Sequence, residues 1–219
     1  MASRRIVHKL VRAVARPRRR VRLDNDARRA QLLQLARKAF SDRSYDEVSI
    51  DDLAREAKIS KGLLYHYFPT KRDLYVAGLR EIADELVART SAIPTNLAPA
   101  ERVRAGLDAY LDHITVHARA FVALMRGGIG SDPEVAEVIE GVRRRLVAQF
   151  IEGSPFAAVL AGNPRFEIAV RGWIGFVEGA SIDWCANPRL SRDELRDLLS
   201  QVLLSLIAVI APQMLTPPA

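Results

Sequence analysis

Apolar residues recur along most of this chain at spacings of three and four, the pattern of helices that bury one face. No convincing run of strictly alternating apolar and polar residues, the pattern of a half-buried strand, interrupts it. The expected fold class is therefore all-α. We expect helices over residues 27–40, 50–57, 61–67, 71–90, 101–117, 118–126, 133–151, 164–185 and 192–210.

Capping residues support the expected starts of several helices. Ser49 and Ser60 stand where N-caps belong, before the second and third helix, and Pro69 ends the third. Ser191 and Glu194 form a capping-box pair before the last helix. The spacing predicts a compact head of three short helices followed by a body of longer ones.

The second and third expected helices are separated by only a few residues. Two short helices joined by a tight turn form a helix-turn-helix, whose second helix enters the major groove of DNA. Lys61, Tyr65 and His66 lie on its exposed face and suit contacts with phosphates and base edges. Gly62 allows the backbone to approach a partner closely. The alternative is that this segment only packs the core of the head.

Charge is unevenly distributed along the chain. The net charge is +7, yet residues 1–23 hold nine basic side chains and no acidic one, so the remainder is close to neutral. These basic residues are Arg4, Arg5, Lys9, Arg12, Arg16, Arg18, Arg19, Arg20 and Arg22. We therefore divide the chain into a disordered basic arm (1–23), a head (24–79) and a body (80–219).

Three interpretations of the basic arm stay open. It is a tail that contacts DNA, a solvated extension without a role, or an amphipathic segment that resembles a transit peptide or a membrane-surface helix. The last interpretation rests on apolar side chains that share one helical face. They are Ile6, Val7, Leu10, Val11 and Val14.

Several classes of protein are disfavoured. Cys185 is the only cysteine, so the chain has no intrachain disulfide, which fits a reducing cytoplasm. The longest mostly apolar stretch, residues 198–211, is too short to span a bilayer comfortably. We find no phosphate-binding glycine loop, nucleophile elbow or zinc-protease motif, and expect neither an enzyme nor a cofactor.

Residues 27–79 resemble the N-terminal domain of the TetR family of bacterial transcriptional regulators. The residues that carry the resemblance are Phe40, Tyr45, Ser49, Ile50, Leu53, Ala54, Ala57, Ile59, Ser60, Gly62, Tyr65, Tyr67, Phe68 and Lys71. The resemblance implies phosphate contacts from Ser49, Ser60, Tyr65, Tyr67 and Lys71. It implies base-facing positions at Lys61, Gly62, Leu63 and His66.

The chain departs from the family pattern at two glycines. Ser44 stands where the family usually has glycine, and Lys58 stands at the usual turn glycine. If the turn requires a positive φ at Lys58, the lysine costs roughly 1 kcal/mol. Neither departure removes a group that faces DNA.

The resemblance further implies a helical second domain that binds a small ligand and dimerises through its last two long helices. Gly172, Gly175 and Gly179 form a smooth strip on the penultimate helix, where another backbone can approach. The last helix has more apolar residues than one buried face needs. For the interface we nominate, besides the glycines, Leu199, Val202, Leu203 and Leu206. The alternative is an ordinary monomer core.

Aromatic and adaptable side chains on the central helices suit a pocket for a hydrophobic small-molecule effector. They are Tyr110, His113, His117, Phe121, Met125, Trp173 and Phe176. The alternative for each is plain core packing. His113 and His117 share a helical face, a spacing that permits two metal ligands. No third ligand stands at motif spacing, and we expect no metal.

The sequence thus predicts a cytoplasmic homodimer that binds double-stranded DNA, without a membrane partner. The favoured interpretation is a repressor that a small molecule releases from a palindromic operator. Alternatives are an activator of the same family, a helical small-molecule-binding protein without DNA binding, and a membrane-surface protein that uses the arm.

Overall fold

The computed structural model describes residues 25–152 and 162–210, and all regular secondary structure in these ranges is helical. The helices are α1 (Asn25–Asp42), α2 (Ile50–Glu56), α3 (Lys61–Tyr67), α4 (Lys71–Ser91), α5 (Pro99–Val116), α6 (Ala118–Arg126), η1 (Gly128–Ser131), α7 (Pro133–Glu152), α9 (Pro164–Ala186) and α10 (Arg192–Ile210). Every expected helix is present, and its ends lie within about two residues of the expected ones. The all-α fold class is confirmed, whereas the basic arm lies outside the described residues.

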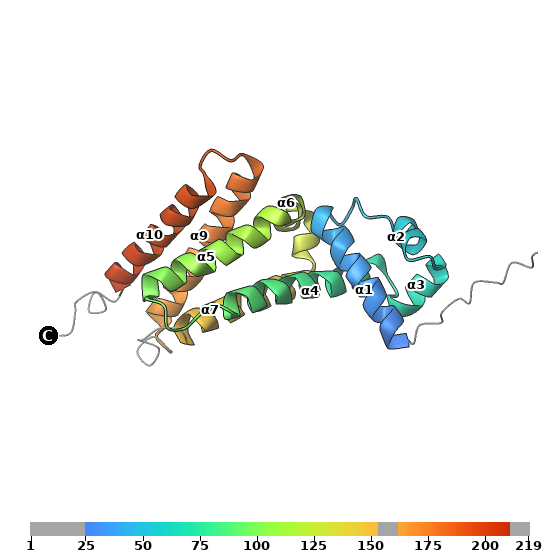
Figure 1. The fold of residues 1–219 in the computed structure, drawn as a ribbon, viewed down its shortest axis with the longest axis horizontal. Coiled ribbons are helices and arrows are strands. Elements are labelled where there is room, and N and C mark those ends of the chain that lie inside the picture. The colour runs from blue at the N-terminus through green and yellow to red at the C-terminus, as the bar shows by residue number, and fades with distance from the viewer. Residues whose placement is uncertain (1–24, 153–161, 211–219) are drawn as a thin grey trace, which may run out of the picture.

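The head consists of α1, α2 and α3, and side-chain caps fix the starts of its two short helices, α2 and α3. The Ser49 hydroxyl accepts the backbone N–H of Asp52 at 3.4 Å, and that of Ser60 accepts the N–H of Leu63 at 3.1 Å. Short helices gain little from their own hydrogen bonds, so such caps and tertiary packing hold them. The head lies at one end of an elongated molecule (Figure 1).

Helix α4 belongs to both parts of the molecule. Its first half packs against α1 in the head, and it also lies along α7 and α5 of the body (Figure 1). Val135 of α7 is fully buried in the same core cluster as the head residues Leu32, Leu53 and Leu64. The boundary that we expected at residue 80 therefore falls inside a continuous helix and beside a shared core.

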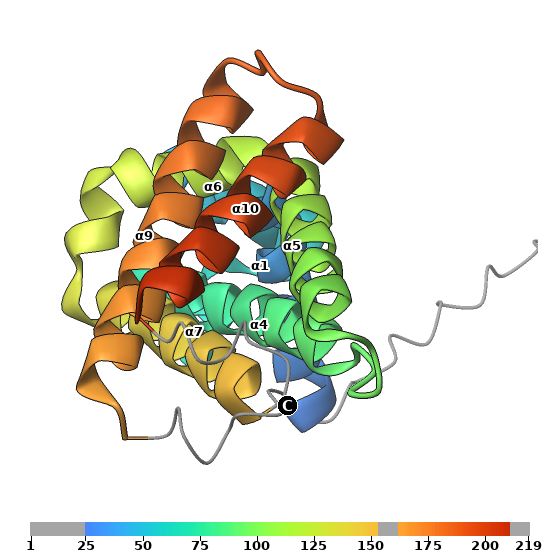
Figure 2. The same cartoon turned by 90° about the vertical axis from the view of Figure 1, so that its left-hand side faces the viewer.

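The body is a helical bundle built around an interior that Figure 2 shows from the end opposite the head. Helices α4, α5, α7 and α9 surround this interior, and α10 lies against α5 and α9. Buried residues of α5, α9 and α10 form one core cluster, which includes Leu111, Val177 and Leu199. The N-terminal end of α5 lies far from the head, whereas α6 lies next to α1 (Figure 1).

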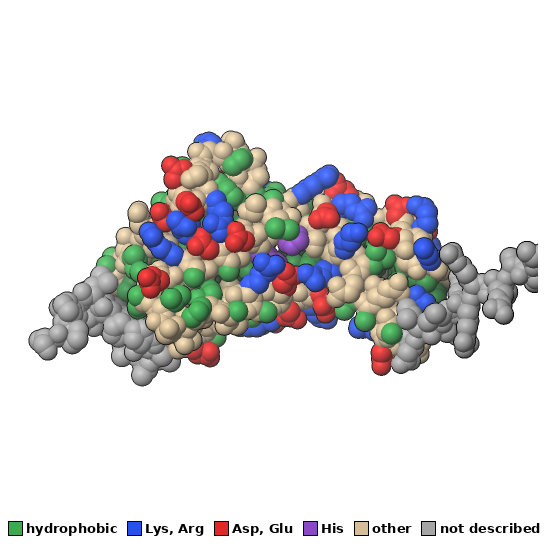
Figure 3. All heavy atoms as spheres, in the orientation of Figure 1, with side chains coloured by type: hydrophobic (Ala, Val, Ile, Leu, Met, Phe, Trp, Pro, Cys, Tyr) green, Lys and Arg blue, Asp and Glu red, His purple; other side chains and the backbone are tan. Residues whose placement is uncertain are grey.

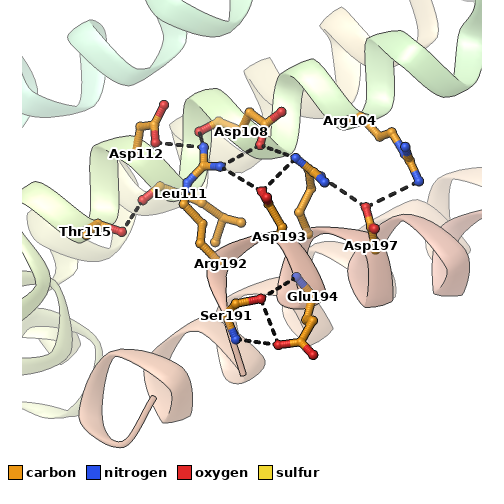
Figure 4. Close-up of polar contacts among 11 residues, drawn as sticks. Arg104, Asp108, Leu111, Asp112, Thr115, Ser191, Arg192, Asp193, Glu194 and Asp197 are labelled. Carbon is orange, nitrogen blue, oxygen red and sulfur yellow. Dashed lines mark hydrogen bonds and ion pairs between the residues drawn. The ribbon is translucent and has the colours of Figure 1, made fainter. Parts of the chain in front are cut away.

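A network of charged side chains fastens α10 to the outer face of α5 (Figure 4). Arg192 Nη1 donates to Asp108 Oδ1 at 2.9 Å, and its Nη2 lies 2.7 Å from Asp112 Oδ1. Arg196 and Arg104 extend the network through Asp197. Figure 3 shows acidic and basic side chains interspersed over this region, so their charges largely balance.

No helix within the described ranges is long and apolar enough to cross a membrane. Ser191 caps α10 as expected: its N–H donates to Glu194 Oε2 at 2.7 Å, and its hydroxyl accepts the N–H of Glu194 at 3.2 Å.

Candidate nucleic-acid interface and internal cavity

Helix α3 has one buried face and one free face. Leu64 is 1% exposed and packs into the core of the head, followed by the equally buried Phe68. Leu63 and Tyr65, by contrast, are 38% and 37% exposed, and Lys61, Gly62 and His66 are exposed as well. The side chains that the sequence assigned to DNA therefore share a free face.

Five of the nine nominated DNA contacts already have a hydrogen-bond or cation–π partner within the head, and two of these, Ser49 and Ser60, are the caps of α2 and α3. Lys61 Nζ lies 3.1 Å from Asp51 Oδ2, and this hydrogen bond raises the pKa of the lysine. The Tyr67 hydroxyl donates to Asn25 Oδ1 at 3.0 Å. Lys71 Nζ lies 4.4 Å from the centre of the Tyr45 ring. A phosphate at Lys61 competes with Asp51, so binding there exchanges one ion pair for another.

The turn between α2 and α3 requires a left-handed residue. Lys58 has φ 56°, the one positive φ of a non-glycine residue in the described part of the chain. Its N–H donates to Arg55 O at 3.1 Å, and that of Ile59 donates to Ala54 O at 3.0 Å. These bonds close the end of α2 in the manner of a C-terminal glycine cap. The expected strain at Lys58 is thus present.

Arg72, at the start of α4, ties the head to the body. Its guanidinium donates from Nε and Nη2 to the two carboxylate oxygens of Asp132, both at 2.6 Å, and from Nη1 to Glu134 at 2.9 Å. Asp132 in turn accepts the N–H of Glu134 at 3.0 Å and thereby caps α7. The hydrogen bond from Arg72 lowers the pKa of Asp132 to about 2. No local pattern predicts this link, because its partners lie 60 positions apart in the chain.

A second link joins α6 to the head. Arg119 forms an ion pair with Glu47, which precedes α2, and this carboxylate also accepts the N–H and hydroxyl of Ser44 at 2.9 Å each. Ser44 thus uses its side chain where the family usually has glycine. Both links contact segments next to the helix-turn-helix, since Glu47 precedes α2 and Arg72 follows α3.

A cavity of about 570 Å³ lies inside the body, between α4, α5, α7 and α9. Its wall is mostly aliphatic and aromatic, which suits an apolar ligand. Five of the seven nominated pocket residues line it: Tyr110, His113, Phe121, Met125 and Trp173. Apolar side chains of α7 also line this space, including Ile139, Val142, Leu146 and Phe150.

The other two nominated pocket residues lie elsewhere. Phe176 is 42% exposed, because its position on α9 places it one turn after Gly172 on the outer face. His117 follows α5 as its C-cap and does not line the cavity, although its ring centre is 5.2 Å from that of His113. We therefore remove Phe176 and His117 from the pocket. Among the described residues, no group of three His, Cys, Asp or Glu side chains is placed to hold a metal ion.

The polar groups of the cavity wall differ in charge and pairing. His113 is 7% exposed, and burial together with His117 lowers its pKa to about 4, so it is neutral at pH 7. Burial raises the pKa of Tyr110. Arg143 is held by Glu178, to which its Nε and Nη2 donate at 2.8 and 2.6 Å.

The sequence analysis did not nominate Arg102 or Arg143 for the cavity wall. A signal for Arg102 existed, since it precedes Gly106 and Tyr110 by four and eight positions and so shares their helical face. For Arg143 no such signal existed, because it sits in a run of three arginines that resembles a solvated face.

The outer faces of α9 and α10 form an exposed surface with apolar side chains. A Cβ added at Gly172, Gly175 or Gly179 would meet no atom within 4 Å. Glycine inside a helix costs up to about 1 kcal/mol relative to alanine, and packing within this chain gives no reason for it. Ile168 and Leu198 are 74% and 41% exposed beside this strip.

Two of the residues that we nominated for a subunit interface are wrongly assigned. Leu199 and Leu203 are completely buried within the chain itself, and Leu199 packs in the core cluster of α5, α9 and α10. A second copy cannot reach them. Val202 and Leu206 are partly exposed and remain predicted interface residues, together with the three glycines.

Comparisons with known proteins cover both parts of the chain. A family model described as "Bacterial regulatory proteins, tetR family" matches residues 32–78, and one described as "Tetracyclin repressor-like, C-terminal domain" matches residues 99–206. The crystal structure of a tetR-family transcriptional regulator from Streptomyces coelicolor has a TM-score of 0.79 and 34% identity. It covers 87% of this chain, which covers 85% of that protein.

Two curated relatives come from Mycolicibacterium smegmatis. The transcriptional activator FasR is 34% identical over 124 residues, 56% of this chain and 57% of FasR. The transcriptional regulator EthR is 30% identical over 142 residues, 61% of this chain and 62% of EthR. These alignments therefore span less than two thirds of the length of either relative.

Proposed function

This chain belongs to the TetR family of bacterial transcriptional regulators, and from that premise we propose that it binds operator DNA as a homodimer and that a small apolar molecule alters this binding. The favoured direction is repression, with release from the DNA when the effector binds. Such a regulator acts in the cytoplasm, where the bacterial chromosome lies. The observation that carries the proposal is the free polar face of α3, supported from behind by Leu64 and Phe68.

DNA binding follows from the chemistry of that face. His66 suits base edges, Lys61 suits a phosphate as well as a base edge, and Ser60, Tyr65 and Lys71 suit phosphate oxygens. Two such helices, related by a two-fold axis, would contact a palindrome with half-sites about one helical turn or a multiple apart.

The experiment is a salt titration of operator binding, after genome-wide footprinting has supplied the operator. Replacing Lys61 with Gln removes one phosphate-neutralising charge and is expected to lower the slope of log K against log salt by about one. Tyr65→Phe is expected to weaken binding about tenfold or less with an unchanged slope. Arg104→Gln, on the outer face of α5, is the matched control and leaves both quantities unchanged. If both α3 variants bind the operator like the parent, the proposed interface is wrong.

Dimerisation is proposed to use the outer faces of α9 and α10. The space around Gly175 accepts a side chain within one chain, so Gly175→Leu leaves the protomer folded but blocks the approach of a second helix. We expect sedimentation to show monomers for this variant and dimers for the parent. Gly128→Leu, at another glycine with open space, serves as the control. If the Gly175→Leu variant is still a dimer, the subunit interface lies elsewhere on the chain.

The effector response is proposed to pass through α4 and α6. Both helices line the cavity, and both carry a link to the head, through Arg72 on α4 and Arg119 on α6. A ligand that fits only one arrangement of these helices shifts the spacing of the two heads in the dimer. The free energy by which the ligand can shift this equilibrium is the difference between its binding free energies for the two arrangements.

Activation is the second candidate direction, because the relative FasR is described as a transcriptional activator. Transcription in vitro from a template that carries the operator separates the two directions. Repression lowers transcript in the absence of effector, whereas activation raises it when the protein is bound.

A further inference from the structure

The cavity is long compared with its width. Its lining on α5 extends from Ala98 to Ile114, and from Arg102 to Ile114 alone this covers about three helical turns. At the rise of an α-helix, that part of the wall is roughly 18 Å long. Because a volume of about 570 Å³ is distributed over this length, the cavity is only wide enough for a slender molecule. The shape therefore favours an extended chain over a compact polycyclic ligand.

The charged side chains of the cavity wall do not balance. Arg143 and Glu178 cancel each other in a two-point ion pair, and His113 is neutral. Arg102 has no carboxylate partner in the described part of the chain, and its Nε is buried without a hydrogen-bond acceptor. Buried donors normally have a hydrogen-bond acceptor, whereas the Arg102 side chain as a whole is only partly buried. One positive charge thus remains unmatched in an otherwise apolar wall.

The two ends of the cavity have different surroundings. Arg102 lies in the first turn of α5, at the end of the helix that is far from the head, and Ile93 and Pro99 also line the cavity. At the other end, Phe121, Leu124 and Met125 of α6 close the wall next to the head. A ligand that places a charged group at the first end therefore points its apolar part at α6.

We propose that the effector is a single-chain amphiphile whose anionic head group binds Arg102 and whose hydrocarbon chain extends along α5 toward α6. This inference rests on the proposed function, because it names the chemical class of the effector. A guanidinium binds carboxylate and phosphate in the same two-point geometry, so either head group satisfies Arg102. A cationic amphiphile meets repulsion there, and a neutral one leaves the Nε donor of Arg102 without an ionic acceptor.

The same arrangement makes the response depend on chain length. A short chain fills the space near Arg102 and leaves Phe121 and Met125 without contact. A chain that reaches α6 packs against both and perturbs the helix that contacts the head. Affinity and DNA release are therefore expected to rise together from octanoate through dodecanoate to hexadecanoate.

Tryptophan fluorescence gives a direct readout of binding in the full chain. Trp173 lines the cavity, and the chain has two tryptophans, so Trp184→Phe leaves Trp173 as the single reporter. The probes are hexadecanoate, hexadecyl phosphate, hexadecanol and hexadecylamine, each used below its micelle concentration. We expect both anions to bind about tenfold or more tightly than the alcohol, and the amine to bind most weakly.

Substitution of Arg102 tests the head-group contact. Arg102→Gln is expected to weaken binding of the two anions about tenfold while it leaves the alcohol unchanged, and Arg102→Lys is expected to restore part of the loss. Arg104→Gln, two positions away on the opposite face of α5, is the matched control with parent affinities. The ratio of hexadecanoate to hexadecyl phosphate identifies which anionic group the site prefers.

Each outcome decides a different claim. Equal binding of the acid and the alcohol, or equal losses for both in Arg102→Gln, overturns the inference. Binding that depends on Arg102 without any change in operator affinity supports the ligand class and contradicts the proposed effector response. Release of the operator by a neutral compound, with no binding of the anions, supports the regulator and contradicts the amphiphile.

Discussion

The head and the body use the same secondary structure in opposite ways. The head packs α1 and the two short helices α2 and α3 around a filled core and leaves its functional side chains outside, where Leu63 and Tyr65 are more than one third exposed. The body surrounds a partly open space of about 570 Å³ and places its candidate functional side chains along the wall. A surface site needs rigid support from behind, whereas an interior site needs room, so the two regions respond differently to the same substitution.

The largest expected contrast comes from truncating matched leucines. Leu64 is 1% exposed in the filled core of the head, and Leu64→Ala is expected to cost about 3 to 4 kcal/mol of unfolding free energy. Leu107 is 4% exposed but lines the cavity, so it has fewer neighbours to lose, and Leu107→Ala is expected to cost roughly half as much. Denaturant unfolding measures both. Equal costs would show that the body packs as tightly as the head.

Protonation of His113 is expected to have the next largest effect. Its pKa is about 4 in the folded protein and 6.5 in the unfolded chain, so the unfolded state binds more protons between these values. Stability is then full above pH 6.5 and falls by about 3 kcal/mol as the pH drops to 4. His113→Gln is expected to remove this part of the pH dependence. Identical profiles for parent and variant between pH 4 and 6.5 would contradict the assignment.

A smaller effect is expected in the turn of the head. Lys58→Gly relieves the left-handed conformation at φ 56° and is expected to stabilise the protein by about 1 kcal/mol or less. Lys58→Ala removes the charge but keeps the conformational cost, so it serves as the control. A gain in both variants would assign the effect to charge rather than to backbone strain.

The smallest effect is expected at the link between the two regions, because solvent screens the partly exposed Arg72–Asp132 pair. The pKa of Asp132 is lowered to about 2, so the stability from this pair is full above about pH 4 and disappears as the pH falls through 2. Asp132→Asn is expected to flatten the acid limb of the unfolding profile slightly. An unchanged limb would leave the link without a measurable role in stability.

Local pattern was enough for most of the fold. Helical spacing and caps such as Ser60 and Ser191 predict the elements because both depend on neighbouring residues. The strain at Lys58 was predicted through the family resemblance, which places a turn glycine at that position. The family resemblance supplied the individual DNA contacts, and these stay predictions until binding is measured.

Tertiary placement was harder to predict. Leu199 and Phe176 were both assigned to the wrong side of their helices, because an apolar residue on an amphipathic helix looks the same whether it faces a core, a cavity or a partner. The role of Arg102 could not be recognised from the sequence, because this role depends on the absence of an acceptor for the Arg102 Nε. Only the folded structure shows which groups surround this atom. The link from Arg72 to Asp132 escaped notice for the same physical reason.

Helix α4 carries a consequence for how sensitive the proposed regulator is in a cell. It runs 21 residues, about 30 Å, from Lys71 beside the DNA-facing surface to Ser91, next to Thr90 in the cavity wall. If effector weakens operator binding by some factor, operator must weaken effector binding by the same factor. Extra copies of the operator would then raise the concentration of effector that half-maximal response requires, so gene dosage would tune the threshold.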